Sequence, residues 1–228
     1  MGAKKELYSF VDKLKKQHGI SDLPQDRSKT LCRDIFGIKV DQMPIVTTGL
    51  RGMAAPAANG KPAVIILNSS RTASEQNFDC MHEAIHIFKH ADKNKASFSC
   101  YDKVRPKQNP FLEWEANEGS AEFIMPYRVF IPEVVKGIAF IEGDHISVPP
   151  EEILKLEQLF YATNQMIELR IQNLKYEIFQ YLSGVHIDQL DIRSLREQEK
   201  SGVSYSSFCI DPSFDIRRFG NHHIIGVQ

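Results

Sequence analysis

The stretch His82-Glu83-Ala84-Ile85-His86 decides how this chain should fold and which chemistry it can carry. Residues four apart fall on one face of a helix, so His82 and His86 can present two imidazole nitrogens to one ion. Glu83 lies on the adjoining flank, where its carboxylate can reach a water molecule bound to that ion. One alternative stays open, in which both histidines are core residues hydrogen-bonded to the backbone and Glu83 lies at the surface.

The residues around this motif predict a strand followed by a helix. Residues 62–68 form a short apolar run typical of a buried strand, and residues 72–75 have the pattern of a capping box, which starts a helix. From residue 73 to residue 90 no Pro or Gly interrupts, and apolar residues recur at helical spacing. We therefore expect a core-facing helix with His90 at its C-terminus, where a cation is favoured.

A zinc site needs a third ligand, and a second acidic helix is predicted over residues 111–126. Glu113 and Asn117 are four apart on it, so Glu113 can bind the ion while Asn117 supports a ligating histidine through a hydrogen bond. Glu115 ranks second as a ligand, because it points about 200° away from Glu113 around the helix. Two further acids of this helix are expected to be solvated charges: Glu118 and Glu122.

Further landmarks surround the two helices. Asn68 ends the predicted strand, Phe78 precedes the histidines, and residues 113–117 read E-x-E-A-N before Met125-Pro126. This two-part pattern, over about residues 40–175, resembles the ImmA/IrrE family of metallopeptidases. The spacing of the second helix also resembles that of the gluzincins, where a Glu ligand is followed four residues later by an acidic or amide partner.

The resemblance implies a set of roles, a fold and a function. The zinc (Zn2+) ligands would be His82, His86 and Glu113, and Glu83 would be the catalytic glutamate. The fold would be α+β, with a zincin-like core whose small sheet packs on the helix that carries His82-Glu83-x-x-His86 (the HExxH motif), followed by a mainly helical, helix-turn-helix-like region. Family members act in cells as proteases on helix-turn-helix repressors. The implied function is a cytoplasmic zinc-dependent endopeptidase that cleaves such a repressor and relieves repression in a phage, mobile element or stress response.

The expected reaction is metal-assisted amide hydrolysis. Zinc makes water more acidic, and Glu83 removes a proton as that water attacks the scissile carbonyl, then passes the proton to the leaving amine. A group must also stabilise the oxyanion, and the sequence leaves four candidates: Tyr101, Tyr127, Arg128 and His145. The alternative to an enzyme is a zincin-like regulatory protein that acts on a repressor by binding alone.

The chain departs from the family pattern at two places. The family usually has Gly where Ile85 lies, and it usually continues after Ala-Asn with x-Phe-Ala, where this chain has Gly119 and Ser120. A Gly in mid-helix costs about 1 kcal/mol relative to Ala. The missing Phe is also expected to remove a packing anchor behind the metal.

Composition agrees with a globular intracellular enzyme. Of 228 residues, 42% are hydrophobic and 25% charged, and the net charge is −1. No apolar run approaches the roughly 18 residues that span a bilayer, and the N-terminus lacks a signal-peptide core, so no membrane association is expected. The cysteines are widely spaced and should be reduced thiols: Cys32, Cys80, Cys100 and Cys209.

Three regions are expected: a zincin-like domain over residues 1–130, a helical, helix-turn-helix-like region over 131–183, and a tail of mixed structure over 184–228. Asn59-Gly60 should form a hairpin turn. The irregular stretch 91–110 is either a lid over the substrate or a disordered insertion. Further helices are predicted at 3–17, 27–36, 127–136, 150–161, 163–174, 175–183 and 192–199. Strands are predicted at 44–48, 50–55, 62–68, 203–210 and 222–227.

The charge of the helical region bears on its partner. Residues 151–182 carry five acidic and three basic side chains. Phosphate binding draws on clustered Lys and Arg, so this balance disfavours direct binding to nucleic acid. The segment is therefore expected to pack or to recognise a protein. The sequence indicates nothing about oligomeric state.

Overall fold

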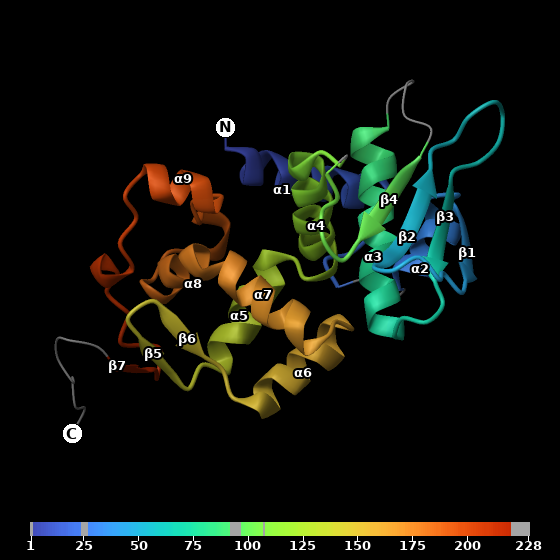
Figure 1. Cartoon of the computed structure of the whole chain (residues 1–228). Helices are drawn as coiled ribbons and strands as arrows, with labels where there is room; N and C mark the ends of the chain where they lie inside the picture. Colours follow the sequence, from blue (N-terminus) through green and yellow to red (C-terminus); the bar gives the residue numbers. More distant parts are fainter. Residues whose placement is uncertain (1, 24–26, 92–96, 107, 220–228) are drawn as a thin grey trace. The chain divides into compact units, whose positions relative to one another are not determined.

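Four short strands form the sheet that carries the candidate site. They lie in the order β1-β3-β2-β4, where β1 is parallel to β3 and β2 is antiparallel to both its neighbours. The computed structural model describes residues 2–23, 27–91, 97–106 and 108–219 (Figure 1). The strands span Lys39–Met43 (β1), Leu50–Ala55 (β2), Val64–Asn68 (β3) and Phe98–Tyr101 (β4).

The predicted strands at 50–55 and 62–68 are confirmed as β2 and β3, and the turn between them is the expected one. Asn59 and Gly60 have φ of 51° and 73°, as a two-residue hairpin turn requires, and an isolated bridge joins Ala58 to Lys61. The prediction of a strand at 44–48 is wrong. Strand β1 ends at Met43, because the next residue, Pro44, has no N–H to donate to a neighbouring strand.

Strand β4 was also unforeseen, since it lies inside the stretch 91–110 that was expected to be irregular. Its four residues form a strand by pairing with β2, a segment almost fifty residues earlier in the chain. Residues 92–96 and 107 lie outside the described residues, so the prediction that the stretch 91–110 forms a lid over the substrate is not tested.

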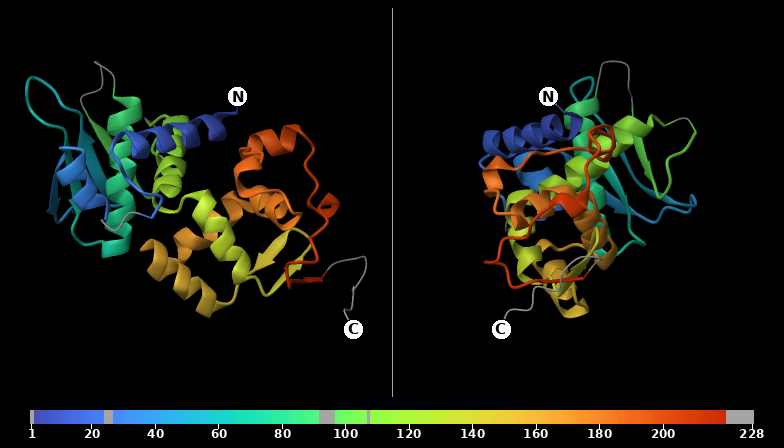
Figure 2. Two further views of the ribbon diagram at one scale, coloured as in Figure 1. Left: turned by 180° about the vertical axis from the view of Figure 1, so that it is seen from behind. Right: turned by 90° about the vertical axis from the view of Figure 1, so that its left-hand side faces the viewer.

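The two predicted metal helices pack against each other. Helix α3 (Ala73–Ile85) continues as a π-helical turn over His86–His90, and it contacts β2, β3, β4 and helix α4 (Pro110–Ile124). Figure 2 shows α3 and α4 side by side. The core between sheet and helices includes Ile65, Leu67 and Met81, which are fully buried. Helices α1 (Ala3–Gln17) and α2 (Ser28–Thr30), the latter extended by a π-helical turn over Leu31–Ile35, precede the sheet.

The chain divides into two compact units. The N-terminal unit comprises residues 7–124 and holds the four-stranded sheet. The C-terminal unit comprises residues 125–228 together with residues 1–6, and the predicted domain limits at 130 and 183 stay predictions. Its elements are α5 (Tyr127–Lys136), β5 (Phe140–Glu142), β6 (His145–Ser147), α6 (Pro150–Phe160), α7 (Asn164–Asn173), α8 (Lys175–Leu182), α9 (Leu195–Lys200) and β7 (Arg217–Phe219).

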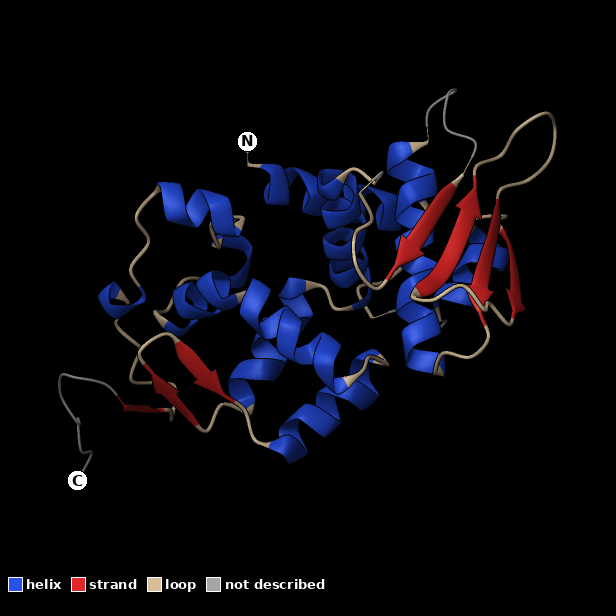
Figure 3. Cartoon of the chain, in the orientation of Figure 1, coloured by secondary structure: helices blue, strands red, loops and turns tan. Residues whose placement is uncertain are grey.

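The C-terminal unit is mainly helical, as predicted, and the chain as a whole is α+β (Figure 3). Helices α6 and α7 are joined by residues 161–163, where Tyr161 adopts a left-handed φ of 52° and Thr163 caps α7. The hairpin of β5 and β6 was not predicted, and residues 203–210 contain a 3-10 turn at Tyr205–Ser207 in place of a strand. The strand predicted at 222–227 lies outside the described residues. None of the helices in the described part of the chain is long and apolar enough to cross a bilayer.

Candidate metal centre

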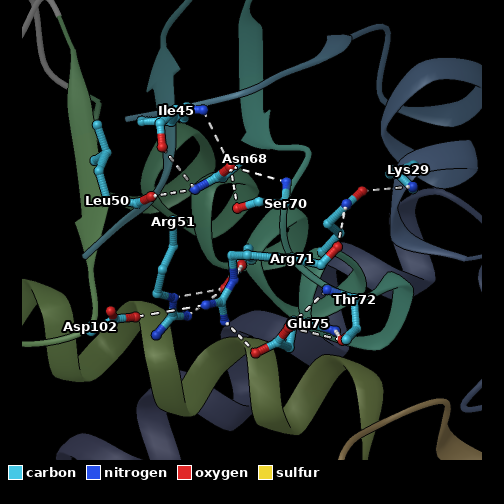
Figure 4. A network of polar contacts seen from close by, with 12 residues as sticks. Lys29, Ile45, Leu50, Arg51, Asn68, Ser70, Arg71, Thr72, Glu75 and Asp102 are labelled. Atoms are coloured by element: carbon cyan, nitrogen blue, oxygen red, sulfur yellow. Dashed lines mark hydrogen bonds and ion pairs between the residues drawn. The ribbon is translucent and has the colours of Figure 1, made fainter. Parts of the chain in front are cut away.

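Side-chain hydrogen bonds determine where helix α3 begins. Thr72 Oγ1 accepts from the backbone N–H of Glu75, and the Glu75 carboxylate accepts from the backbone N–H of Thr72, which completes the predicted capping box. Just upstream, the Asn68 amide donates to the carbonyl of Leu50 and accepts from the backbone N–H of Ser70 (Figure 4). Asn68 therefore ties the end of β3 both to β2 and to the loop that enters α3.

A buried carboxylate anchors α3 one helical turn before Glu83. Asp79 is fully buried, and its two oxygens accept from Nε of Arg51 at 2.8 Å and Nε of Arg71 at 2.6 Å. Burial raises the pKa of Asp79, although both arginines oppose this. Arg51 lies at an irregularity in the pairing of β2 with β4, and a bulge of this kind re-aims a side chain. Figure 4 shows Arg51 and Arg71 within this network.

The structure brings together the three side chains that the sequence nominated as ligands. His82 Nε2 and His86 Nε2 are 3.1 Å apart. The Glu113 carboxylate faces both, with Oε2 at 3.5 Å from His82 Nε2 and Oε1 at 3.6 Å from His86 Nε2. All three residues are buried. Among the described residues they form the single group of three or more His, Cys, Asp or Glu that could hold a metal ion.

Hydrogen bonds on the far side of each imidazole place the protons. His82 Nδ1 lies 3.0 Å from Asn117 Oδ1, an oxygen that only accepts, so Nδ1 carries the proton and Nε2 a lone pair. His86 Nδ1 lies 2.9 Å from His90 Nδ1, and His90 Nε2 lies 3.0 Å from the Glu115 carboxylate. If His90 donates from Nε2 to the Glu115 carboxylate, its Nδ1 accepts the proton of His86 Nδ1, which leaves a lone pair on His86 Nε2. Two lone pairs and a carboxylate then face one another at short range.

This arrangement fits zinc. Each ligand of a tetrahedral zinc site lies about 2.0–2.1 Å from the ion, so neighbouring ligand atoms are about 3.3 Å apart. The separation of 3.1 Å between the two imidazole nitrogens is close to that value, and each of these nitrogens has a different oxygen of Glu113 at 3.5 or 3.6 Å. Three converging acceptors without a proton between them repel one another, and a cation removes the repulsion. Two His and one Glu, with a fourth position left over, is the donor set of catalytic zinc sites.

The ionisation of the three side chains also suits a cation. Burial lowers the pKa of His82 to about 4, so its imidazole is neutral at pH 7. Burial acts to raise the pKa of Glu113, but its contacts with the two histidines dominate and lower it to about 2. A neutral imidazole and an ionised carboxylate are the forms that bind metal.

Glu83 is fully buried, which excludes the alternative that placed it at the surface. Within the described part of the chain, neither of its carboxylate oxygens reaches a hydrogen-bond partner. Burial and the nearby charges of Glu113 and Asp79 raise its pKa to about 8, and the charge of Arg51 opposes this only in part. A buried carboxyl group with no partner is costly unless a ligand or water satisfies it.

A glycine leaves room for that carboxyl group. A Cβ atom on Gly52 of β2 would lie 3.4 Å from Glu83 Oε1 and 3.2 Å from the carbonyl oxygen of Ile66. The strand therefore approaches the candidate base closely because position 52 has no side chain.

The expectations for three side chains are wrong: Glu118, Glu122 and His90. Glu118 and Glu122 are buried, because α1 covers this side of α4: the Tyr8 hydroxyl donates to Glu118, and Glu122 raises the pKa of the buried Lys15 against the effect of burial. His90 is not a cationic helix cap, since burial lowers its pKa to about 4 and its ring bonds to two side chains. Glu115, which ranked below Glu113 as a ligand, contacts His90 and Lys89 and not the ligand atoms, in agreement with that ranking.

The two departures from the family pattern lie next to each other in the structure. A Cβ atom on Gly119 would meet the side chain of Ile85 at 3.4 Å and that of Leu7 at 3.3 Å. Ile85 is fully buried and fills the space that a large side chain at position 119 would need. The side chain of Ile85 on α3 therefore packs against α4 at the position where the family pattern has Phe.

Of the four oxyanion candidates, Tyr101 ends β4 in the same unit as the site, with the Arg105 guanidinium 4.6 Å from its ring. The other three belong to the C-terminal unit: Tyr127, Arg128 and His145. Sequence reasoning missed His90 as the partner of His86 and Glu115 as the partner of His90, although the four-residue spacing from His86 to His90 was visible.

Comparison with known proteins bears on this geometry. The Peptidase M78 family model, described as the IrrE N-terminal-like domain, matches residues 33–172. The chain belongs to this family. The IrrE-like match contains both helices of the site and extends into α7.

Other comparisons add less. No curated protein matches the chain. A solved structure described as a Mycobacterium tuberculosis transcriptional regulator is similar at 15% sequence identity, with a TM-score of 0.47. That similarity covers 75% of this chain and 47% of the other, so the chain spans about half the length of that protein.

Proposed function

We propose that this IrrE-like protein is a cytoplasmic zinc-dependent endopeptidase that hydrolyses a peptide bond in a helix-turn-helix transcriptional repressor and so relieves repression. The observation that carries the proposal is the buried convergence of His82, His86 and Glu113 beside a carboxyl group, Glu83, without a partner among the described residues. A site built for stability alone would pair Glu83 with a donor.

Each residue has a separate task in the reaction. When bound, zinc supplies Lewis-acid activation of water and of the scissile carbonyl. Glu83 accepts a proton from the attacking water at a carboxylate oxygen and passes it to the leaving amine. Burial raises the pKa of Glu83 to about 8 in the metal-free chain, and the positive charge of a bound zinc ion would lower it again, which favours the ionised form that can accept a proton.

The C-terminal unit is the proposed contact surface for the repressor. Three leucines on α6 and α7 are about half exposed: Leu154, Leu159 and Leu169. Exposed apolar side chains at neighbouring helices suit a protein partner, and the surplus of acidic over basic residues at 151–182 disfavours a nucleic acid. Regulation of transcription would thus act through the repressor.

The test compares the purified wild type with Glu83→Gln and with Glu199→Gln as a matched control, since Glu199 is exposed on α9. Wild type should carry about one zinc per chain by elemental analysis. Each protein is incubated with helix-turn-helix repressors encoded near it, and the products are identified by mass spectrometry. Wild type and Glu199→Gln should produce the same two fragments. Glu83→Gln should retain zinc and produce none.

The outcomes separate enzyme from binding protein. Full cleavage by Glu83→Gln would refute the assigned base. Release of the repressor from its operator by both wild type and Glu83→Gln, without fragments, would show a non-proteolytic zincin-like regulator.

A further inference from the structure

A chain of hydrogen bonds lies behind His86 and continues to helix α4. His86 Nδ1 is 2.9 Å from His90 Nδ1, and His90 Nε2 is 3.0 Å from Glu115 Oε2. The other oxygen of Glu115 lies 3.2 Å from Lys89 Nζ. The His86 ring is also stacked on Phe98 of β4, with centroids 4.7 Å apart and an interplanar angle of 15°. The part of the His86 ring that faces away from His82 and Glu113 is therefore surrounded by residues of three elements: the turn that continues α3, helix α4 and strand β4.

The order of donors and acceptors along this chain follows from the carboxylate at one end and a neutral His90 next to it. An ionised carboxylate only accepts, so Glu115 requires the proton of His90 to be on Nε2. A neutral His90 with its proton on Nε2 has a lone pair on Nδ1, which must accept from His86. The proton of His86 is then on Nδ1, and its Nε2 lone pair points at His82 and Glu113.

We propose that His90 and Glu115 are positioning residues that hold His86 in the tautomer and orientation needed to bind the metal. The inference rests on the metal centre of the proposed function. Hydrogen-bond partners of this kind fix ring orientation, and their loss typically weakens metal affinity by 10–100-fold.

Helix geometry explains why two residues are needed here and one suffices for His82. Asn117 lies four residues after Glu113, on the same face of α4, so its amide reaches His82 directly. Glu115 lies about 200° around the helix from Glu113. His90, one turn beyond His86, spans the gap that this rotation leaves. The pair thus supplies to His86 what Asn117 supplies to His82.

Substitutions at His90 can separate its two hydrogen bonds. Asn places its amide oxygen where Nδ1 of His lies, so His90→Asn keeps the acceptor for His86 and loses the bond to Glu115. Gln places its amide where Nε2 lies, so His90→Gln keeps the bond to Glu115 and loses the acceptor. His90→Phe keeps the ring and loses both. The full chain carrying each substitution is titrated with zinc in competition with a chromophoric chelator of known affinity.

His90→Phe and His90→Gln should each bind zinc about 10–100-fold more weakly than wild type, and His90→Asn should bind close to wild type. Glu115→Gln should weaken zinc binding in the wild type and have no effect in the His90→Asn background, because Asn accepts without help from Glu115. Wild-type affinity in His90→Phe, or equal losses in His90→Asn and His90→Gln, would overturn the proposal. Asn117→Ala is the comparison, since it removes the equivalent support of His82.

A second readout distinguishes this proposal from the metal centre itself. Nitrogen-15 NMR of the imidazoles reports which nitrogen carries the proton. In the metal-free wild type and in His90→Asn, His86 should be protonated on Nδ1, whereas in His90→Phe the Nε2-protonated form should appear. An unchanged tautomer in His90→Phe contradicts the inference even if zinc binds. A wild type that binds no zinc but shows the expected tautomers contradicts the metal centre and retains the hydrogen-bond chain.

Discussion

Ile85 and Gly119 occupy one shared space, so enlarging position 119 should be tolerated better once Ile85 is reduced. The change to test is Ile85→Ala combined with Gly119→Leu. Ile85 is fully buried, and a single added carbon at position 119 already lies 3.4 Å from it. The two substitutions therefore act on the same atoms, and their effects on the free energy of unfolding should not add.

The magnitudes follow from the packing. Ile85→Ala should cost 2–5 kcal/mol, the usual cost of removing a buried Ile side chain to Ala. Gly119→Leu gains about 1 kcal/mol of helix propensity and loses about 1–3 kcal/mol or more to overpacking against Ile85 and Leu7. The double variant should be more stable than the sum of the single changes by about 0.5–3 kcal/mol, the range for residues in contact.

The assay is urea denaturation of the four proteins at one fixed zinc concentration, because bound zinc adds to the measured stability. Ile65→Ala is the matched control: Ile65 is also fully buried, but it lies on β3. Its combination with Gly119→Leu should be additive. If the Ile85→Ala and Gly119→Leu double variant is additive within about 0.5 kcal/mol, the two positions do not compensate and the reasoning is refuted.

Three further predictions concern other parts of the chain. Gly52→Ala should retain zinc and slow cleavage, because the new Cβ would lie only 3.2 Å from the carbonyl oxygen of Ile66 and would displace the strand that lies against Glu83 Oε1; unchanged rates would contradict this. Lys4→Met should lower the stability by about 3 kcal/mol, since it leaves the buried Glu177 carboxylate without its cation at 2.9 Å, and urea denaturation measures it. Burial acts to raise the pKa of Glu75, but its hydrogen bonds with Thr72 at the helix cap dominate and lower it. The stabilisation of the fold by ionised Glu75 is therefore fully present above the ordinary pKa of 4.5 and is lost as the pH falls through the lowered value. Glu75→Gln should flatten that acid loss in a pH series of melting temperatures.

Much of the candidate site could be predicted because its residues are related by helical spacing. His82 and His86 share a face by the period of one helix, and Glu113 and Asn117 share a face of another. The hairpin turn at Asn59-Gly60 and the capping box at Thr72 are equally local, since each depends on residues within three or four positions. Such features need no knowledge of what packs against them.

The errors arose where a distant segment decides the environment. Residues 44–48 have strand-like side chains, yet Val46 is 99% exposed, because the neighbour of β3 is residues 39–43. The sequence around Glu118 predicted a solvated acid. Glu118 is buried because α1 packs here and places the Tyr8 hydroxyl against its carboxylate. Strand β4 exists because β2 pairs with it.

By itself, the sequence indicated the candidate metal ligands and the helices that present them, because a helical period is a local property. Only the tertiary structure decided that the two helices face each other so that Glu113 reaches both histidines. It also decided that Glu83 is buried without a partner among the described residues, and that His90 and Glu115 support His86. These depend on distances between segments more than twenty residues apart, and no periodicity along the chain specifies such distances.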